Sequence, residues 1–250
     1  MTWKPVDNPR EIDGSSFFNR SAYRFPEYEL PDCFVRLGQR FEQRRLRSPE
    51  VSLTSTLAIS QNLCRRLGYV DVLAKVIETT LLDTRIGAFG QSELVSGFLV
   101  SHFGACKSVL DAVAISLNHV YGLGLTGGNL DMHKHVFWST LMSRAAFREH
   151  DYNTHRPLID SVTKWRDEAV HRIPPLVIVS GAGHPASVPT PKPNVTLCLV
   201  LGITTEQFFN LNKSGYRADK FGHPLHFHRL WRSSLEELCS LACDDIATHM

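Results

Sequence analysis

The stretch His155–Pro175, with the sequence HRPLIDSVTKWRDEAVHRIPP, decides the fold of this chain. Its apolar residues recur every three to four positions, the spacing of one face of an α-helix. These residues are Leu158, Val162, Trp165, Ala169 and Ile173. Two consecutive prolines end the pattern, because proline cannot continue a helix. The sequence therefore predicts an amphipathic helix over residues 156–173 with one buried stripe.

Helical patterns of the same kind extend outward from this stretch in both directions. The longest predicted helix, Ser92–Tyr121, has apolar residues on nearly all sides, which is typical of a central buried helix. Gly68 is expected to separate two shorter helices, because glycine often ends a helix. The sequence thus predicts an all-α fold, a bundle of helices around one core. The other predicted helices cover residues 32–47, 48–68, 70–84, 132–148 and 230–247.

The flanking regions have a different character. Residues 1–31 alternate prolines with aromatic residues, which predicts an extended arm that lies on the bundle. Leu176–Val179 and Thr196–Leu201 are short β-type runs joined by a proline-rich loop, so a small β-hairpin or flap is expected before the C-terminal helix. We expect one domain over 1–250, with an arm at 1–31, main helices at 32–175, an irregular or β segment at 176–224 and a last helix at 225–250.

Composition restricts the class of protein. The chain has 250 residues, 43% hydrophobic and 21% charged, as in ordinary globular proteins, and its formal net charge of +2 does not by itself indicate nucleic-acid binding. The start of the chain has no apolar signal segment, and no run reaches about 18 uninterrupted apolar residues. We therefore expect a cytoplasmic protein without a membrane span, whose scattered cysteines are reduced core residues; a metal or disulfide role is the alternative.

Three polar residues stand near the end of the opening stretch. Asp167 and His171 are four residues apart, so they share a face of the predicted helix, and Arg166 lies at the border of the apolar stripe. A carboxylate in this position can orient an imidazole, and an arginine can bind phosphate. Histidine could take the proton of a ribose 2′-hydroxyl while arginine neutralises charge on the phosphate. These are the groups that a metal-independent ribonuclease needs.

The run Arg166-Asp167-Glu168-Ala169-Val170-His171, with the long helix before it, resembles the HEPN family. Members are helical bundles whose signature is an arginine followed four to six residues later by a histidine. The resemblance covers about residues 70–175 and implies Arg166 and His171 as catalytic residues, with Asp167 in support. It also implies an RNA substrate, a homodimer in which two motifs meet in one cleft, and a toxin or defence role with a partner or antitoxin protein. Other members are non-catalytic modules that bind RNA or a protein.

The signature spacing does not identify itself, because three other pairs in this chain also satisfy it. These pairs are Arg144–His150, Arg148–His155 and Arg217–His223. Only Arg166–His171 lies late on an amphipathic helix that follows a long buried one. Hence the context selects this pair, and two hypotheses stay open: a ribonuclease, or a helical binding module with these residues as ordinary surface or core groups.

Other motifs are assigned less specific roles. Four arginines recur near helical spacing on residues 32–47; they form either a solvated basic face or a phosphate-contacting RNA-binding stripe. The glycine pattern at 122–127 follows a helix instead of a strand, so it lacks the context of a dinucleotide site. Histidines at 133 and 135 and at 223–228 lack the spacing of a recognisable metal set, and we expect no metal or cofactor. The four arginines are Arg36, Arg40, Arg44 and Arg47.

Overall fold

The computed structural model of this chain describes residues 31–47, 54–171, 175, 177–180, 196–200 and 221–249. These residues are mainly helical, which confirms the predicted all-α class. The α-helices are α2 (Asp32–Arg47), α3 (Thr54–Leu82), α4 (Ala88–Val120), α5 (His135–Ala145), α6 (Glu149–Asn153), α7 (Arg156–His171) and α9 (His226–His249). The predicted N-terminal arm, apart from Pro31, and the proline-rich loop of the predicted flap lie outside the described residues.

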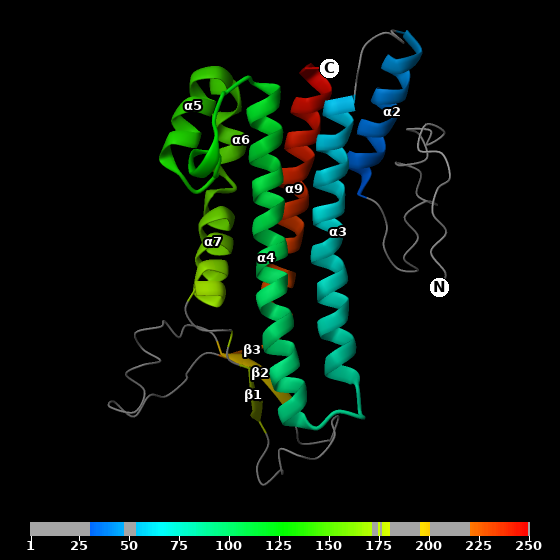
Figure 1. The fold of residues 1–250 in the computed structure, drawn as a ribbon, viewed down its shortest axis with the longest axis vertical. Coiled ribbons are helices and arrows are strands. Elements are labelled where there is room, and N and C mark those ends of the chain that lie inside the picture. The colour runs from blue at the N-terminus through cyan, green and yellow to red at the C-terminus, as the bar shows by residue number, and fades with distance from the viewer. Residues whose placement is uncertain are drawn as a thin grey trace.

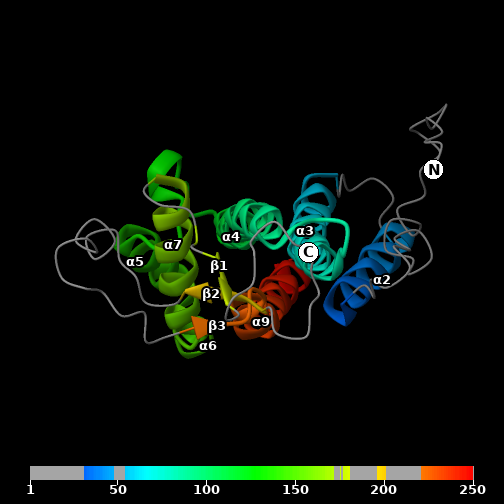
Figure 2. The same ribbon diagram turned by 90° about the horizontal axis from the view of Figure 1, so that it is seen from below.

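The helices α3, α4 and α9 form the middle of the molecule. Figures 1 and 2 show α2 beside α3 and α9 on one flank, and α7 with α5 and α6 on the other. The buried apolar side chains of all these layers join in one continuous core. The core therefore connects the two flanks of the bundle.

The helix α3 is a single element, so the prediction of a helix end at Gly68 was wrong. The buried residues Leu63, Leu67, Val70, Ala74 and Ile77 continue one stripe through this position at helical spacing. Burial of that stripe against α4 outweighs the cost of one interior glycine, which is about 1 kcal/mol relative to alanine.

The helix α4 is the central element, as its apolar composition predicts. Residues that include His102, Phe103, Cys106, Val113 and Leu117 are buried along it, and α3, α7 and α9 all pack on it. Its length and hydropathy also meet those of a membrane-spanning helix, although half of its most apolar window is buried inside the chain. Central core helices have the same properties, so this resemblance to a membrane span is weak evidence.

The helix predicted over 132–148 is shorter than expected: α5 ends at Ala145, a 3-10 turn follows at Ala146–Arg148, and the separate helix α6 begins at Glu149, beyond the predicted range. A buried carboxylate on α9 holds this divided segment. Tyr152 on α6 donates to Asp245 Oδ2 at 2.6 Å, and Arg148 Nε donates to Asp245 Oδ1 at 2.9 Å. Asp245 is only 1% exposed, so these two donors replace the water it would otherwise bind. Basic residues are favoured near the C-terminal end of a helix, because they complement the helix dipole. The two hydrogen bonds explain why α9 instead carries the acidic Asp245 there.

The described strands form a small antiparallel sheet with the order β1 (Val177–Ser180), β2 (Thr196–Val200) and β3 (Phe221–Gly222). In the pairing of β1 with β2, Val177 lies opposite Leu199 and Ser180 opposite Thr196. Two serines on α4 hold the start of this sheet: Ser96 Oγ donates to the carbonyl of Pro175 at 2.6 Å, and Ser92 Oγ donates to that of Val177 at 2.5 Å. The chain that leaves α7 is therefore fixed along the first turns of α4.

Candidate functional site at the end of α7

The helix α7 is anchored by its tryptophan. The ring of Trp165 lies 4.3 Å from that of Phe227 on α9 and 5.9 Å from that of Phe103 on α4, measured between centroids. The predicted stripe residues Leu158, Val162 and Ala169 are buried beside it. This stripe turns the opposite face of α7 outward, so the polar residues at its end stand on the surface.

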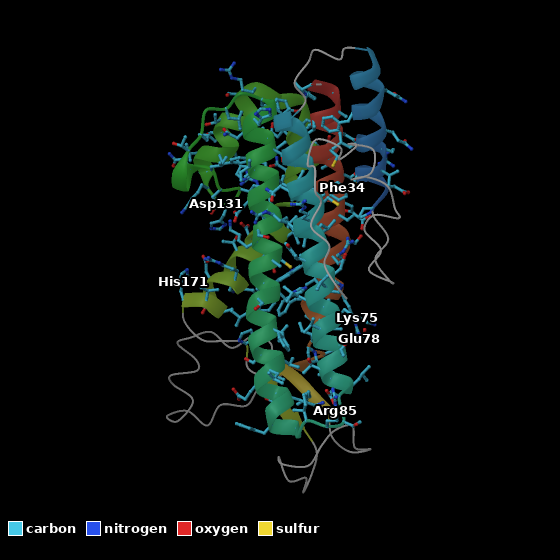
Figure 3. The ribbon with its side chains drawn as sticks, turned by 45° about the vertical axis from the view of Figure 1, so that its right-hand side comes forward. Phe34, Lys75, Glu78, Arg85, Asp131 and His171 are labelled. Carbon is cyan, nitrogen blue, oxygen red and sulfur yellow. The ribbon has the colours of Figure 1, made fainter. Side chains whose placement is uncertain are left out.

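Arg166 and His171 lie together at that end. Arg166 Nη1 is 3.1 Å from His171 Nε2 and donates a hydrogen bond of 2.9 Å to Asp167 Oδ1. His171 is exposed, and the Arg166 side chain is 33% exposed. Figure 3 shows His171 at the outer edge of the molecule. A guanidinium can only donate, so His171 Nε2 must accept, which makes the ring in this arrangement neutral with its proton on Nδ1.

Asp167 lies differently from the prediction. Its carboxylate was expected to orient His171, but it accepts a hydrogen bond from Arg166. The reason is that Arg166 is long enough to reach both neighbours, whereas the short aspartate points away to solvent, with 53% of its side chain exposed. Arg166 is therefore the residue that connects the three, and Asp167 orients the arginine.

The competing arginine–histidine pairs have other environments. Arg148 is engaged by Asp245 and by Asp151, so it is part of the contact between α6 and α9. Arg144 and His150 are exposed and separated by the 3-10 turn that ends α5. Arg217 lies outside the described residues. Among the described pairs of this spacing, a contact between arginine and histidine is recorded only for Arg166–His171.

The predicted basic stripe of α2 is not part of the same surface. Arg36 and Arg40 are exposed, while the side chains of Arg44 and Arg47 lie outside the described part of the structure. Figures 1 and 2 place α2 and α7 on opposite flanks of the bundle. A single phosphate backbone could therefore reach both groups only by passing around α3, α4 or α9.

A partly buried group of polar residues connects α3, α4 and α9, and the sequence did not indicate it. His102 Nε2 is 3.3 Å from His228 Nδ1, and Arg232 Nε donates to Asp71 Oδ1 at 2.5 Å. Burial, with a smaller effect of His228, lowers the pKa of His102 to about 3. Burial also lowers the pKa of His228, against the opposing effect of Asp71. The spacing of four residues between His228 and Arg232 was visible in the sequence, but their partners on α3 and α4 were not.

Neither predicted histidine group forms a metal site in the described part of the chain. His223 Nδ1 accepts the backbone N–H of Leu225, and His226 packs edge-on against Phe227. His133 Nδ1 lies 3.2 Å from Asp160 Oδ1. No group of three or more histidine, cysteine or acidic residues is arranged to hold a metal ion among the residues described.

A surface hollow of about 380 Å³ lies between α6 and α9, at the other end of α7 from His171. His150, His155 and Glu237 are among its lining residues. It is therefore separate from the arginine–histidine contact.

Comparison of the chain with models of protein families, with curated proteins and with solved structures gave no match.

Proposed function

We propose that this protein is a metal-independent endoribonuclease of the HEPN type, with Arg166 and His171 as its catalytic residues. The observation that carries the proposal is the 3.1 Å contact between Arg166 Nη1 and His171 Nε2 on an exposed helix end. The contact joins a proton acceptor to a permanent cation. These two groups supply the general base and the charge stabilisation that cleavage of RNA by its own 2′-hydroxyl uses.

The proposed reaction begins when an RNA phosphate replaces His171 as a partner of Arg166. The guanidinium has five N–H donors, so it can hold a phosphate while Asp167 keeps its own hydrogen bond. Release from Arg166 frees the Nε2 lone pair of His171, which then takes the proton of the 2′-hydroxyl. The 2′-oxygen attacks the phosphorus, the bond to the 5′-oxygen breaks, and a 2′,3′-cyclic phosphate forms. Water protonates the departing 5′-oxygen, and the resulting hydroxide takes the proton from His171. In this scheme Arg166 stabilises the additional negative charge.

We further propose a HEPN-like homodimer in which two copies of this helix end face each other. Val170, which precedes His171 and follows Arg166 by one helical turn, is 46% exposed although it is apolar. A second copy would cover it and would place a second Arg166 and His171 in the same cleft. The proposed setting is a toxin or defence system in the cytoplasm, in which a partner protein restrains the activity.

The experiment is an RNA cleavage assay in the presence of a chelator with three proteins: wild type, Arg166→Ala and His171→Ala. We expect wild type to produce cyclic-phosphate ends and each variant to lose at least 100-fold in rate, as is typical for a general base or a charge-stabilising group. The exposed pair Arg144 and His150 supplies the matched control, because Arg144→Ala and His150→Ala remove the same groups at a similar spacing.

Two results would contradict the proposal. One is full activity in Arg166→Ala or His171→Ala proteins whose circular dichroism and melting match those of wild type. The other is equal loss in the Arg144→Ala control, which would indicate a non-specific effect of positive charge.

The alternative function is a non-catalytic helical module that binds RNA or a protein. The exposed Arg36 and Arg40 on the flank opposite α7 favour it, because they offer cations that the α7 site does not use. Under this alternative, Arg36→Glu with Arg40→Glu would abolish RNA retention, whereas Arg166→Ala would not change it. Binding measured at two salt concentrations distinguishes the two surfaces.

A further inference from the structure

The surface hollow between α6 and α9 is lined mostly by polar side chains from both sides. Asp151 belongs to α6, His155 follows that helix directly, and Glu237 and Ser240 belong to α9. Figure 2 shows α6 beside α9, so tertiary packing brings together two walls that are far apart in the sequence. The volume of about 380 Å³ lies within the range of about 300–1,000 Å³ that is usual for small-molecule sites.

His155 is a buried histidine at the wall of this hollow, with 7% of its surface exposed. Its backbone is fixed, because its N–H donates to the carbonyl of Tyr152 at 3.1 Å and its carbonyl accepts the N–H of Ile159 at 3.0 Å. Within the described part of the chain, the His155 ring makes no hydrogen bond. A buried polar group without a partner costs about 1–3 kcal/mol, so such groups are uncommon. The ring is therefore available to a ligand in the hollow.

The charged groups of the lining are acidic. They are Asp151 and Glu237, and no lysine or arginine of the described residues lines the hollow. Arg148 Nη1 donates to Asp151 Oδ2 at 3.0 Å, but the same arginine also serves the buried Asp245. Ser233 Oγ donates to Glu237 Oε1 at 3.3 Å. Each lining carboxylate therefore keeps one oxygen for another donor, and the hollow has excess negative charge on a chain whose formal net charge is +2.

We propose that this hollow binds a small polyamine, whose ammonium groups donate hydrogen bonds to Asp151, Glu237 and His155. An ammonium group has three N–H donors and no acceptor, so it matches this set of acceptors. Two carboxylates, one on each helix, match two ammonium groups better than one. The inference goes beyond RNA cleavage and does not depend on it, because the hollow lies at the other end of α7 from His171.

The protonation state of His155 agrees with an ammonium partner. Burial lowers the pKa of His155, against the opposing effects of Glu237 and Asp151. The ring is therefore neutral at neutral pH, and one of its nitrogens can accept a hydrogen bond. A protonated ring would instead repel an ammonium group.

A metal ion fits this lining less well than a polyamine. Metal ligands converge to about 2.0–2.6 Å from one ion. Among the residues that the structure describes, no three histidine, cysteine or acidic side chains are arranged in that way. The ammonium groups of a polyamine are spaced along a flexible chain, and each needs acceptors at only about 2.7–3.2 Å. A polyamine can therefore use acceptors on separate walls that do not converge on one point.

The test is isothermal titration calorimetry of spermidine into the full chain at about 0.15 M salt, where weak surface attraction is screened. We expect wild type to bind one molecule per chain in a saturable manner. Glu237→Gln should weaken the binding at least about 10-fold, because it removes a charge-assisted hydrogen bond. The matched control is Glu149→Gln on the exposed start of α6, which removes the same charge outside the lining. This control should change the affinity by less than about 2-fold.

Two further measurements identify the ligand class and the role of the histidine. Nα-acetyl-lysine amide, which has one ammonium group, should bind at least about 10-fold more weakly than spermidine, because it can satisfy only one carboxylate. His155→Phe should also weaken spermidine binding. If this variant does not fold, the comparison of Glu237→Gln with Glu149→Gln decides.

Four results would overturn the proposal. The first is the absence of saturable spermidine binding to wild type, and the second is equal weakening in Glu237→Gln and Glu149→Gln, which would indicate general charge attraction. The third is equal affinity for Nα-acetyl-lysine amide, which would identify a lysine of a partner protein as the occupant. The fourth is one Mn²⁺ ion bound per chain and lost in Glu237→Gln, which would make the hollow a metal site.

Discussion

The buried histidine His102 should make the protein sensitive to acid. His102 lies on the central helix α4 and has no exposed surface. One ring nitrogen is 3.3 Å from His228 Nδ1, and the other is 3.9 Å from Cys106 Sγ. Burial lowers its pKa from 6.5 to about 3. Below pH 6.5 the unfolded chain therefore binds a proton that the folded chain does not.

The sign and the size follow from this difference in proton binding. A group whose pKa is lower in the folded state than in the unfolded state favours unfolding as the pH falls, because the unfolded chain then binds more protons. From pH 8 to pH 5, His102 alone should lower the free energy of unfolding by about 2 kcal/mol. By pH 3 the loss should reach about 4–5 kcal/mol, a large part of the stability of a typical domain.

Other histidines contribute to the same slope, so a variant is needed to isolate His102. The pKa values of His228, His155 and His223 are also lowered, in each case first by burial. Urea unfolding of wild type and His102→Gln between pH 5 and pH 8 gives the contribution of His102 as a difference. We expect the loss between pH 8 and pH 5 to be about 2 kcal/mol smaller in His102→Gln.

The exposed His119, also on α4, supplies the control: His119→Gln should keep the wild-type pH dependence. The reasoning would be refuted if wild type and His102→Gln lost the same free energy over this range. That result would mean that His102 is protonated in the folded protein or is reached by water.

Three substitutions test other contacts of the fold by urea unfolding at neutral pH. Asp245→Asn should lower the free energy of unfolding by about 2–4 kcal/mol, because it leaves Arg148 without its most buried partner. The control, Asp244→Asn on the neighbouring exposed residue, should change this free energy by less than about 0.5 kcal/mol. Equal effects of the two substitutions would contradict the role of Asp245 as the partner of Arg148. Trp165→Ala should cost about 3 kcal/mol through lost packing on Phe227, and unchanged stability would mean that α7 is held by other contacts. Gln91→Leu should cost about 1–3 kcal/mol, because Gln91 Nε2 donates to two carbonyls at the end of α3, and no loss would indicate that water replaces it.

The periodicity of apolar residues was sufficient to predict most helices. It placed α4, α7 and α9 nearly correctly, because each carries a long pattern that only a helix can bury. It failed at Gly68, where continuation of a buried stripe outweighed a local helix breaker. It also failed over 132–148, where the contacts of Arg148 and Tyr152 with Asp245, far away in sequence, favour a broken segment.

The sequence placed Arg166, Asp167 and His171 near the end of one helix for the same reason. Arg166 and His171 are five residues apart on one helix, so local geometry alone brings them within reach. The Asp167 carboxylate could contact either Arg166 or His171. The choice depended on the directions of the side chains, which the spacing of the residues does not specify. The position of α2 on the opposite flank from α7 depended on helix packing, and the pattern of arginines contained no information about it.

The sequence by itself determined the helical class and the buried stripe of α7, because these depend on residues within a few turns of one helix. The tertiary structure decided which distant groups meet. It buried His102 beside His228 and placed Asp245 beside Arg148 and Tyr152. The physical reason is that such contacts depend on how helices cross and on which side chains fill the space between them, and periodicity along one helix does not encode either.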